Sequence, residues 1–325
     1  MREALEQPGL ISLAAGFTDN PSLPVAETRA IIEGLLRGRN GRSHLQYGTT
    51  YGDERLRSLT AQRLAQMDGH SKRGKGYEPS RVLITHGSQQ LLYILTEILF
   101  DTGDIVLVED PSYFVYLGIM QSHGIQGRGI GMEPDGLDLA SLETTLKTLK
   151  QSGELARLKA LYLVGYHSNP TGITTSASKK EAVLKILRHY EKGAGHPIYL
   201  IEDAAYRELR FTGTDTPSAL SFHNAATRVI YTSTYSKPFA TGMRVGYGFL
   251  PEPLLTSATR VKGNHDFGTA NFLQQILSRA VASGGYEEHV QKIRKRYASK
   301  ARAMTRACKK HFPDKVKWEN PEGGL

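Results

Sequence analysis

The sequence contains few of the features that mark secreted or membrane proteins. Cys308 is the only cysteine among 325 residues, so no disulfide framework is possible and a reducing, cytoplasmic compartment is expected. No apolar run approaches the ~20 residues of a membrane span, and the opening residues Met-Arg-Glu-Ala-Leu-Glu-Gln lack the apolar centre of a signal peptide. There is no internal repeat or low-complexity tract, which argues against a string of separate small domains. We therefore expect a soluble cytoplasmic protein without a membrane partner.

The formal net charge of +9 arises in one segment of the chain. Nine basic residues lie between positions 292 and 310, with no acidic residue among them. They alternate with apolar residues at helical spacing, which predicts an amphipathic helix with a solvated basic face. A nucleic-acid site would require interleaved aromatic residues or a groove-reading motif, and neither is visible. A nucleic-acid partner is therefore not expected.

Short apolar runs alternate with helix-like segments through the middle of the chain. The strand-like runs are residues 82–85, 105–109, 160–164, 198–202, 229–233 and 245–250. Helix-like segments, for example 91–100 and 179–191, separate several of them. This alternation predicts an α/β fold with a mostly parallel sheet sandwiched by helices. In such sheets ligands bind beyond the carboxyl ends of the strands.

The stretch 229–246 carries the clearest chemistry. A predicted buried strand leads into Thr234, Ser236 and Lys237, and Arg244 follows seven residues after the lysine. Partial burial and the charge of Arg244 should lower the pKa of Lys237, and a neutral amine can form a Schiff base with a carbonyl group. The hydroxyls and the guanidinium suit a phosphate. The alternative is a surface turn with a solvated lysine.

The turns after the preceding strands carry further candidates. Gly87, Ser88 and Gln89 stand where a strand passes into an apolar helix, so free N–H groups and the positive end of the helix dipole suit an anion there. Pro111 fixes a turn before Tyr113, which on the residues alone could equally be a packed core tyrosine.

Two more turns complete the set. Asn169 lies in an Asn-Pro-Thr-Gly turn after the strand 160–164. Asp203 follows the strand 198–202, and an aspartate at a buried strand end is costly unless a cation pairs with it. The alternative is a helix N-cap at Asp203 followed by a core tyrosine, Tyr206.

Together these motifs resemble the signature of the fold-type-I pyridoxal-phosphate enzymes and, within them, the class I/II aminotransferases. Thr234-Tyr-Ser236-Lys237 followed by Arg244 resembles the family's Ser-x-Ser-Lys and arginine, with threonine where serine is more common. The other family motifs occur in the same order from about residue 10 to the last residue. The resemblance implies the fold-type-I large domain with a small α+β domain, here partial.

The resemblance also implies the chemistry. Lys237 would hold pyridoxal 5'-phosphate as a Schiff base and would move a proton as general base and then as general acid. Asp203 would pair with the protonated pyridine nitrogen, which then withdraws electrons from the substrate's Cα. Asn169 and Tyr206 would contact the phenolic oxygen of the cofactor. Tyr113 would stack on its ring.

Further roles follow from the same resemblance. Residues matching the phosphate site are Gly87, Ser88, Gln89, Thr234, Ser236 and Arg244. Gly16 would let the backbone approach the substrate's carboxylate, and Asn169 would also face the substrate. Tyr47 matches a tyrosine that reaches the phosphate of the neighbouring subunit, so a homodimer with two shared sites is expected. No metal ligand is predicted.

The resemblance suggests three parts, the last of them incomplete. We expect an N-terminal arm over residues 1–30, a large pyridoxal-phosphate-binding domain over 31–265, and an interdomain helix with an incomplete C-terminal small domain over 266–325. No position matches the arginine that clamps the substrate's α-carboxylate in the family. We therefore expect a C-terminally truncated chain, with the apolar face of the helix near 290–310 left exposed and efficient transamination dependent on the further segment.

The predicted function is an aminotransferase that moves an amino group between an L-amino acid and a 2-oxo acid. One alternative is a lyase on the same scaffold, because the substrate pocket, which these motifs do not define, selects the reaction. Another is the cofactor-binding effector domain of a transcription regulator, which the absence of a preceding helix-turn-helix segment argues against. A third is a catalytically inactive fragment. The motifs name neither the amino donor nor the acceptor.

Overall fold

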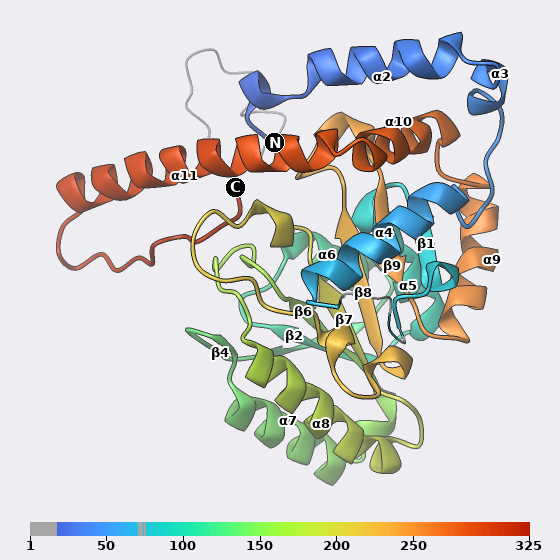
Figure 1. Ribbon diagram of the computed structural model, residues 1–325. Helices are drawn as coiled ribbons and strands as arrows, with labels where there is room; N and C mark the ends of the chain where they lie inside the picture. Colours follow the sequence, from blue (N-terminus) through green and yellow to red (C-terminus); the bar gives the residue numbers. More distant parts are fainter. Residues whose placement is uncertain (1–17, 71–73, 75) are drawn as a thin grey trace.

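The structure is a computed structural model that describes residues 18–70, 74 and 76–325 (Figure 1). The predicted substrate contact Gly16 lies outside the described residues. No helix in the described ranges is both long enough and apolar enough to cross a membrane.

A seven-stranded sheet forms the centre of the molecule, in the order β1-β9-β8-β7-β6-β2-β3. Its strands are β1 Val82–Thr85, β2 Ile105–Glu109, β3 Gln126–Ile130, β6 Leu158–Val164, β7 Tyr199–Asp203, β8 Val229–Thr234 and β9 Gly246–Phe249. A separate two-stranded ribbon consists of β4 Met132–Glu133 and β5 Gly136–Leu137. Within the seven-stranded sheet β9 alone runs antiparallel to its neighbours. The prediction of a mostly parallel sheet is confirmed, and the carboxyl ends of the other six strands share one edge.

Helices cover both faces of this sheet. The helices of the described residues are α2 Val25–Arg37, α3 Gly41–His44, α4 Glu54–Met67, α5 Gly87–Leu99, α6 Phe114–Ser122, α7 Leu139–Gln151, α8 Ala177–Ala194, α9 Leu254–Asp266, α10 Asn271–Ala282 and α11 Gly285–His311. Apolar residues of α5, α6 and α9 form one core with the sheet, and those of α4, α7, α8 and α10 form the other. The sandwich predicted from the alternation of strands and helices is therefore present.

The central strands are buried on both sides, which explains their continuous apolar sequences. In β6, Leu161 and Leu163 join one core while Tyr162 and Val164 join the other. The edge strand β3 escaped prediction because its sequence Gln-Gly-Arg-Gly-Ile contains no apolar run. Its position beside β2 is what makes it a strand.

Helix α11 begins against the body of the protein and then extends beyond it (Figure 1). Tyr286, Val290 and Ile293 are buried, whereas none of residues 299–311 is. Part of the basic face is paired, since Arg296 and Lys300 both contact the carboxylate of Asp19. The predicted amphipathic helix is confirmed, and its distal half is exposed.

The last residues return to the body of the protein. The backbone N–H groups of Phe211 and Thr212 both donate to the carbonyl of Glu322, at 2.9 and 3.0 Å. Gly323 lies against the ring of His167, because a Cβ at Gly323 would stand 2.3 Å from the Nε2 atom of that ring. The end of the predicted C-terminal part is thus hydrogen-bonded to the chain beyond β7.

Candidate active site

A cavity of about 320 Å³ opens at the carboxyl edge of the sheet. Its lining consists of Gly87, Ser88, Gln89, Tyr113, Val164, Asn169, Asp203, Ala205, Tyr206, Thr234, Ser236, Lys237, Thr241 and Arg244. Every candidate residue named from the sequence lies in this lining except Gly16 and Tyr47. Segments far apart in the sequence meet here because parallel strands deliver their carboxyl ends to one edge.

Lys237 enters the cavity from the turn that follows β8. Burial lowers the pKa of its ammonium group, and the positive charge of Arg244 lowers it further. Both causes agree with the direction expected from the sequence. A larger fraction of the amine is therefore neutral, and nucleophilic, near neutral pH than for a solvated lysine.

The start of α5 and Arg244 together form a site for an anion. The first N–H groups of α5, which begins at Gly87, have no partner within the helix. Gly87 has a φ of +76°, and a Cβ at this position would stand 2.7 Å from Nη2 of Arg244. Glycine thus permits the close approach of the guanidinium to the turn. Arg244 itself has a left-handed backbone conformation with a φ of +48°, which is uncommon for a residue other than glycine. Its Nη1 donates to the hydroxyl of Ser236 at 3.4 Å.

Thr234 lines the cavity but has a structural task. Its hydroxyl donates to the carbonyl of Val245 at 3.1 Å and accepts from the backbone N–H of Ser236 at 3.0 Å. The hydroxyl proton of Thr234 is therefore already used in a hydrogen bond within the protein. Thr234 shapes the turn that presents Ser236 and Lys237, and the hydroxyl of Ser236 is the one nearer to Arg244.

Asp203 is a buried carboxyl group at the end of β7, with 4% of its surface exposed. Tyr162 donates to Oδ2 at 3.0 Å and the N–H of Ala205 donates to Oδ1 at 3.1 Å. Burial nevertheless raises the pKa of Asp203 to about 6, since these hydrogen bonds offset the desolvation only in part. A cationic group in the cavity would stabilise the carboxylate further.

Three half-buried side chains line the space near Asp203. Asn169 forms a side-chain hydrogen bond with Tyr206, whose pKa is raised mainly by burial. Burial also raises the pKa of Tyr113 to about 12, with the charge of Asp203 contributing. All three side chains line the same cavity as Asp203.

The donor set fits pyridoxal 5'-phosphate. Lys237 offers an amine to an aldehyde, Arg244 and the start of α5 offer donors to a phosphate, and Asp203 offers an acceptor to a ring nitrogen. Asp203 is the most informative of the three, because a cationic ring nitrogen would stabilise the carboxylate of a buried group whose pKa is raised.

Tyr47 lies outside this cavity. Its side chain is 83% exposed, and its ring meets Phe267 edge-on with 5.4 Å between centroids. Within one chain, therefore, Tyr47 does not reach the other candidate residues.

The sequence did not single out Tyr162, which donates to Asp203. The signal was present in the strand register. Val164 pairs with Asp203 across β6 and β7, and Tyr162 shares the face of Val164 because strand side chains alternate.

Comparison with known proteins assigns the family. The sequence profile of the family "Aminotransferase class I and II" matches residues 8–325. An uncharacterised aminotransferase of Saccharolobus solfataricus is 32% identical over 320 residues, which is 98% of this chain and 76% of that protein. The crystal structure of LysN, an alpha-aminoadipate aminotransferase of Thermus thermophilus complexed with N-(5'-phosphopyridoxyl)-L-leucine, superposes with a TM-score of 0.84. It is 30% identical and covers 100% of this chain and 77% of that one.

A regulator is also among the relatives. A helix-turn-helix-type transcriptional regulator of Bacillus subtilis, itself uncharacterised, is 28% identical over 252 residues, 78% of this chain but 49% of its own length. The similarity is greater and longer for the proteins named as aminotransferases. The fold and the site thus define a fold-type-I enzyme architecture. The chain belongs to the class I and II aminotransferase family.

Proposed function

We propose that the chain binds pyridoxal 5'-phosphate in this cavity and transfers an amino group between an L-amino acid and a 2-oxo acid. The observation that carries the proposal is that an amine of lowered pKa, Lys237, and a buried carboxyl group of raised pKa, Asp203, line the same cavity. The bound cofactor would supply a positively charged ring that withdraws electrons from the substrate's Cα.

Lys237 would act through its Nζ atom. Nζ would hold the cofactor through its aldehyde carbon, and once the substrate's amino group has displaced it, the freed neutral amine would accept the proton from the substrate's Cα and later return it. Burial and the neighbouring Arg244 favour this neutral form.

The surrounding residues would bind and orient the cofactor. Asp203 would keep the ring nitrogen protonated, and the ring's charge would offset the cost of burying the carboxylate. Tyr113 would stack on the ring, and Asn169 and Tyr206 would donate to the phenolic oxygen. The phosphate would be held by Gly87, Ser88 and Gln89 at the start of α5 and by Ser236 and Arg244. Thr234 would fix the turn that carries Ser236. Gly16 and Asn169 would face the substrate.

The same proposal includes a homodimer. Tyr47 and Phe267 form an exposed aromatic pair outside the cavity of their own chain, 83% and 58% exposed. Such a pair is suited to a contact with a second copy, where Tyr47 would reach the partner's phosphate site. Two further statements stay predictions from the sequence: the division of the chain into three parts at residues 30 and 265, and the cytoplasmic location.

The direct test is an assay of amino-group transfer. A panel of L-amino acids is incubated with the chain, pyridoxal 5'-phosphate and a 2-oxo acid, and the new amino acid and new 2-oxo acid are quantified together. Equal amounts of the two products are expected, and none with Lys237→Ala. The exposed Lys185→Ala serves as a control that should behave as the unaltered chain. Release of ammonia without a new amino acid would instead indicate a lyase.

A further inference from the structure

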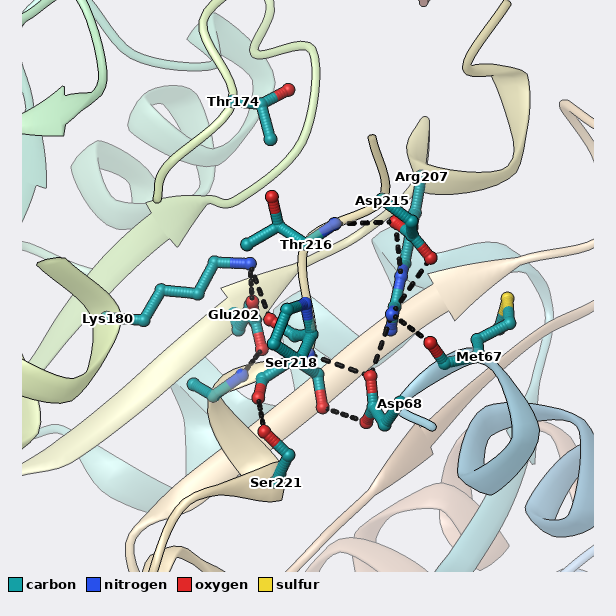
Figure 2. A network of polar contacts seen from close by, with 12 residues as sticks. Met67, Asp68, Thr174, Lys180, Glu202, Arg207, Asp215, Thr216, Ser218 and Ser221 are labelled. Atoms are coloured by element: carbon teal, nitrogen blue, oxygen red, sulfur yellow. Dashed lines mark hydrogen bonds and ion pairs between the residues drawn. The ribbon is translucent and has the colours of Figure 1, made fainter. Parts of the chain in front are cut away.

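Two buried ion pairs belong to one network of polar contacts (Figure 2). Two of their members, Glu202 and Arg207, directly adjoin the cavity residues Asp203 and Tyr206 in the sequence. Lys180 of α8 contacts Glu202 of β7 at 2.9 Å, and neither side chain has any exposed surface. Arg207 contacts Asp68 at 2.7 Å, with side chains 1% and 0% exposed. Buried charges of this kind are stable only with good geometry and further hydrogen bonds.

Those further hydrogen bonds go to the chain beyond β7. Lys180 donates to the carbonyl of Pro217 at 3.1 Å, and the N–H of Ala219 donates to Glu202 at 2.7 Å. Asp68 accepts from both the N–H and the hydroxyl of Ser218, at 2.8 and 2.5 Å. The two ion pairs therefore hold both ends of the segment 207–219, which directly follows the cavity residue Tyr206.

The ring of Tyr166 joins the two cations. Nζ of Lys180 lies 3.7 Å from the ring centroid, and Cζ of Arg207 lies 4.9 Å from it. Tyr166 is 1% exposed, and its hydroxyl has no hydrogen-bond partner within the described part of the chain. The ring thus contacts two buried cations through its π system, and cation–π attraction is strongest where the cation is desolvated.

The contact between the Tyr166 ring and Arg207 connects the two turns that carry Asn169 and Tyr206. Tyr166 precedes Asn169 by three residues, and Arg207 directly follows Tyr206. The backbone also joins the two turns, because the N–H of Gly165 donates to the carbonyl of Asp203 at 2.9 Å. Closer to Asn169 the bonds are local, as from the N–H of Ser168 to the carbonyl of Ile173. In the cavity the two turns meet again through the side-chain hydrogen bond between Asn169 and Tyr206.

We propose that Tyr166, whose ring contacts both Lys180 and Arg207, is a positioning residue that fixes the turn of Asn169 against the turn of Tyr206. In this way the contacts of the Tyr166 ring would determine how the side chains of Asn169 and Tyr206 are oriented toward the phenolic oxygen of the cofactor. The inference rests on the proposed function, because it assumes that this oxygen lies between them. Tyr166 itself does not line the cavity.

The consequence is a change in proton affinity at the cofactor. Donors to the phenolic oxygen stabilise its anionic form, so they lower the pH at which the proton shared with Nζ of Lys237 is lost. If the two turns shift apart, these donors weaken and that midpoint should rise. Binding of the phosphate depends on α5 and Arg244 and should change little.

The experiment compares Tyr166→Leu with Tyr166→Phe. The leucine variant removes the π face, whereas the phenylalanine variant removes only a hydroxyl without a partner. The visible absorbance of the chain with bound cofactor is titrated with pH. For Tyr166→Leu the midpoint should rise by about half to one pH unit, with kcat reduced more than KM is changed. For Tyr166→Phe the midpoint should stay within about 0.2 units of the unaltered chain.

Arg207→Lys keeps the proposal testable if Tyr166→Leu fails to fold. The lysine retains a charge for Asp68 but loses the planar group over the ring, so a smaller rise in the midpoint is expected. Equal midpoints in all folded variants would refute the positioning role while leaving the proposed function intact. An unaltered chain that develops no visible absorbance with pyridoxal 5'-phosphate would refute the proposed function, and the positioning role with it.

Discussion

Two buried carboxyl groups, Asp203 and Glu109, lie at the carboxyl edge of the sheet, at the ends of the two strands β7 and β2 that flank β6. Glu109 ends β2 with 1% of its surface exposed, and its Oε2 accepts from the N–H of Val164 at 2.9 Å. Burial raises the pKa of Glu109 to about 8, and the charge of Asp203 adds to the rise. Both groups therefore bind a proton more tightly in the folded chain than in the unfolded one, so both make stability fall as pH rises.

Asp203→Asn should separate stability from cofactor binding. The pKa of Asp203 rises on folding from 3.8 to about 6, so its contribution is most favourable below pH 3.8 and is lost by about pH 6. Asparagine should stabilise the cofactor-free chain at pH 8 by roughly 1–3 kcal/mol and weaken pyridoxal-phosphate binding at least tenfold. Urea unfolding and fluorescence titration measure the two effects. A variant that is less stable yet binds the cofactor normally would contradict the assignment of Asp203.

Glu109→Gln should flatten the pH profile of stability. Glutamine imitates the protonated acid, so at pH 5, where the unaltered chain has lost only about 1 kcal/mol at this group, the two free energies of unfolding should be close. As pH rises from 4.5 towards about 8 the unaltered chain loses stability at this group, up to a few kcal/mol, and the variant should not. Urea unfolding at pH 5 and pH 9 makes the comparison. Parallel losses in both proteins would show that Glu109 is not the group responsible.

Among single residues, the sequence indicated those at or just after the ends of predicted strands and missed aromatic residues in or beside a buried strand. Lys237, Asn169 and Asp203 follow predicted strands, where side chains are available to a ligand. Tyr162 and Tyr166 were missed because an aromatic residue in or next to a buried strand has the composition of core. Their partners come from segments distant in the sequence, so only the folded arrangement identifies them.

At the scale of elements, the passage from β1 into α5 determines the anion site. Gly87→Ala should weaken cofactor binding by about tenfold, ~1.4 kcal/mol, because its Cβ would collide with Arg244. Gly153→Ala is the matched control, since Gly153 has a similar φ of +78° but open space around its Cβ position. Both variants should lose stability from backbone strain. Equal cofactor affinity in the two would contradict the account of this turn.

The strands were predicted to within two residues at each end wherever the sequence has a continuous apolar run. This holds for β1, β2, β6, β7, β8 and β9. Edge elements such as β3 depend on their neighbours for hydrogen bonds and carry no such run. Prediction from sequence was therefore accurate for the buried centre, which also positions the candidate site.

At the scale of the whole molecule, the exposed Tyr47 predicts shared sites. The mass in solution should be twice the 35.9 kDa of one chain, by sedimentation equilibrium. Tyr47→Ala and Lys237→Ala should each impair the protein alone. A mixture of the two, unfolded and refolded together, should recover about a quarter of the sites, because one site of each mixed dimer carries neither substitution. No recovery would indicate that Tyr47 acts within its own chain or not at all.

The most direct test of the central claim is to identify the amine that captures the aldehyde. The full chain is incubated with pyridoxal 5'-phosphate, reduced with borohydride to make the bond permanent, digested and analysed by mass spectrometry. The account predicts one modified peptide, with the cofactor on Lys237, at one equivalent per chain. Modification of a different lysine at that stoichiometry, or an unmodified Lys237 in a chain saturated with the cofactor, would contradict it.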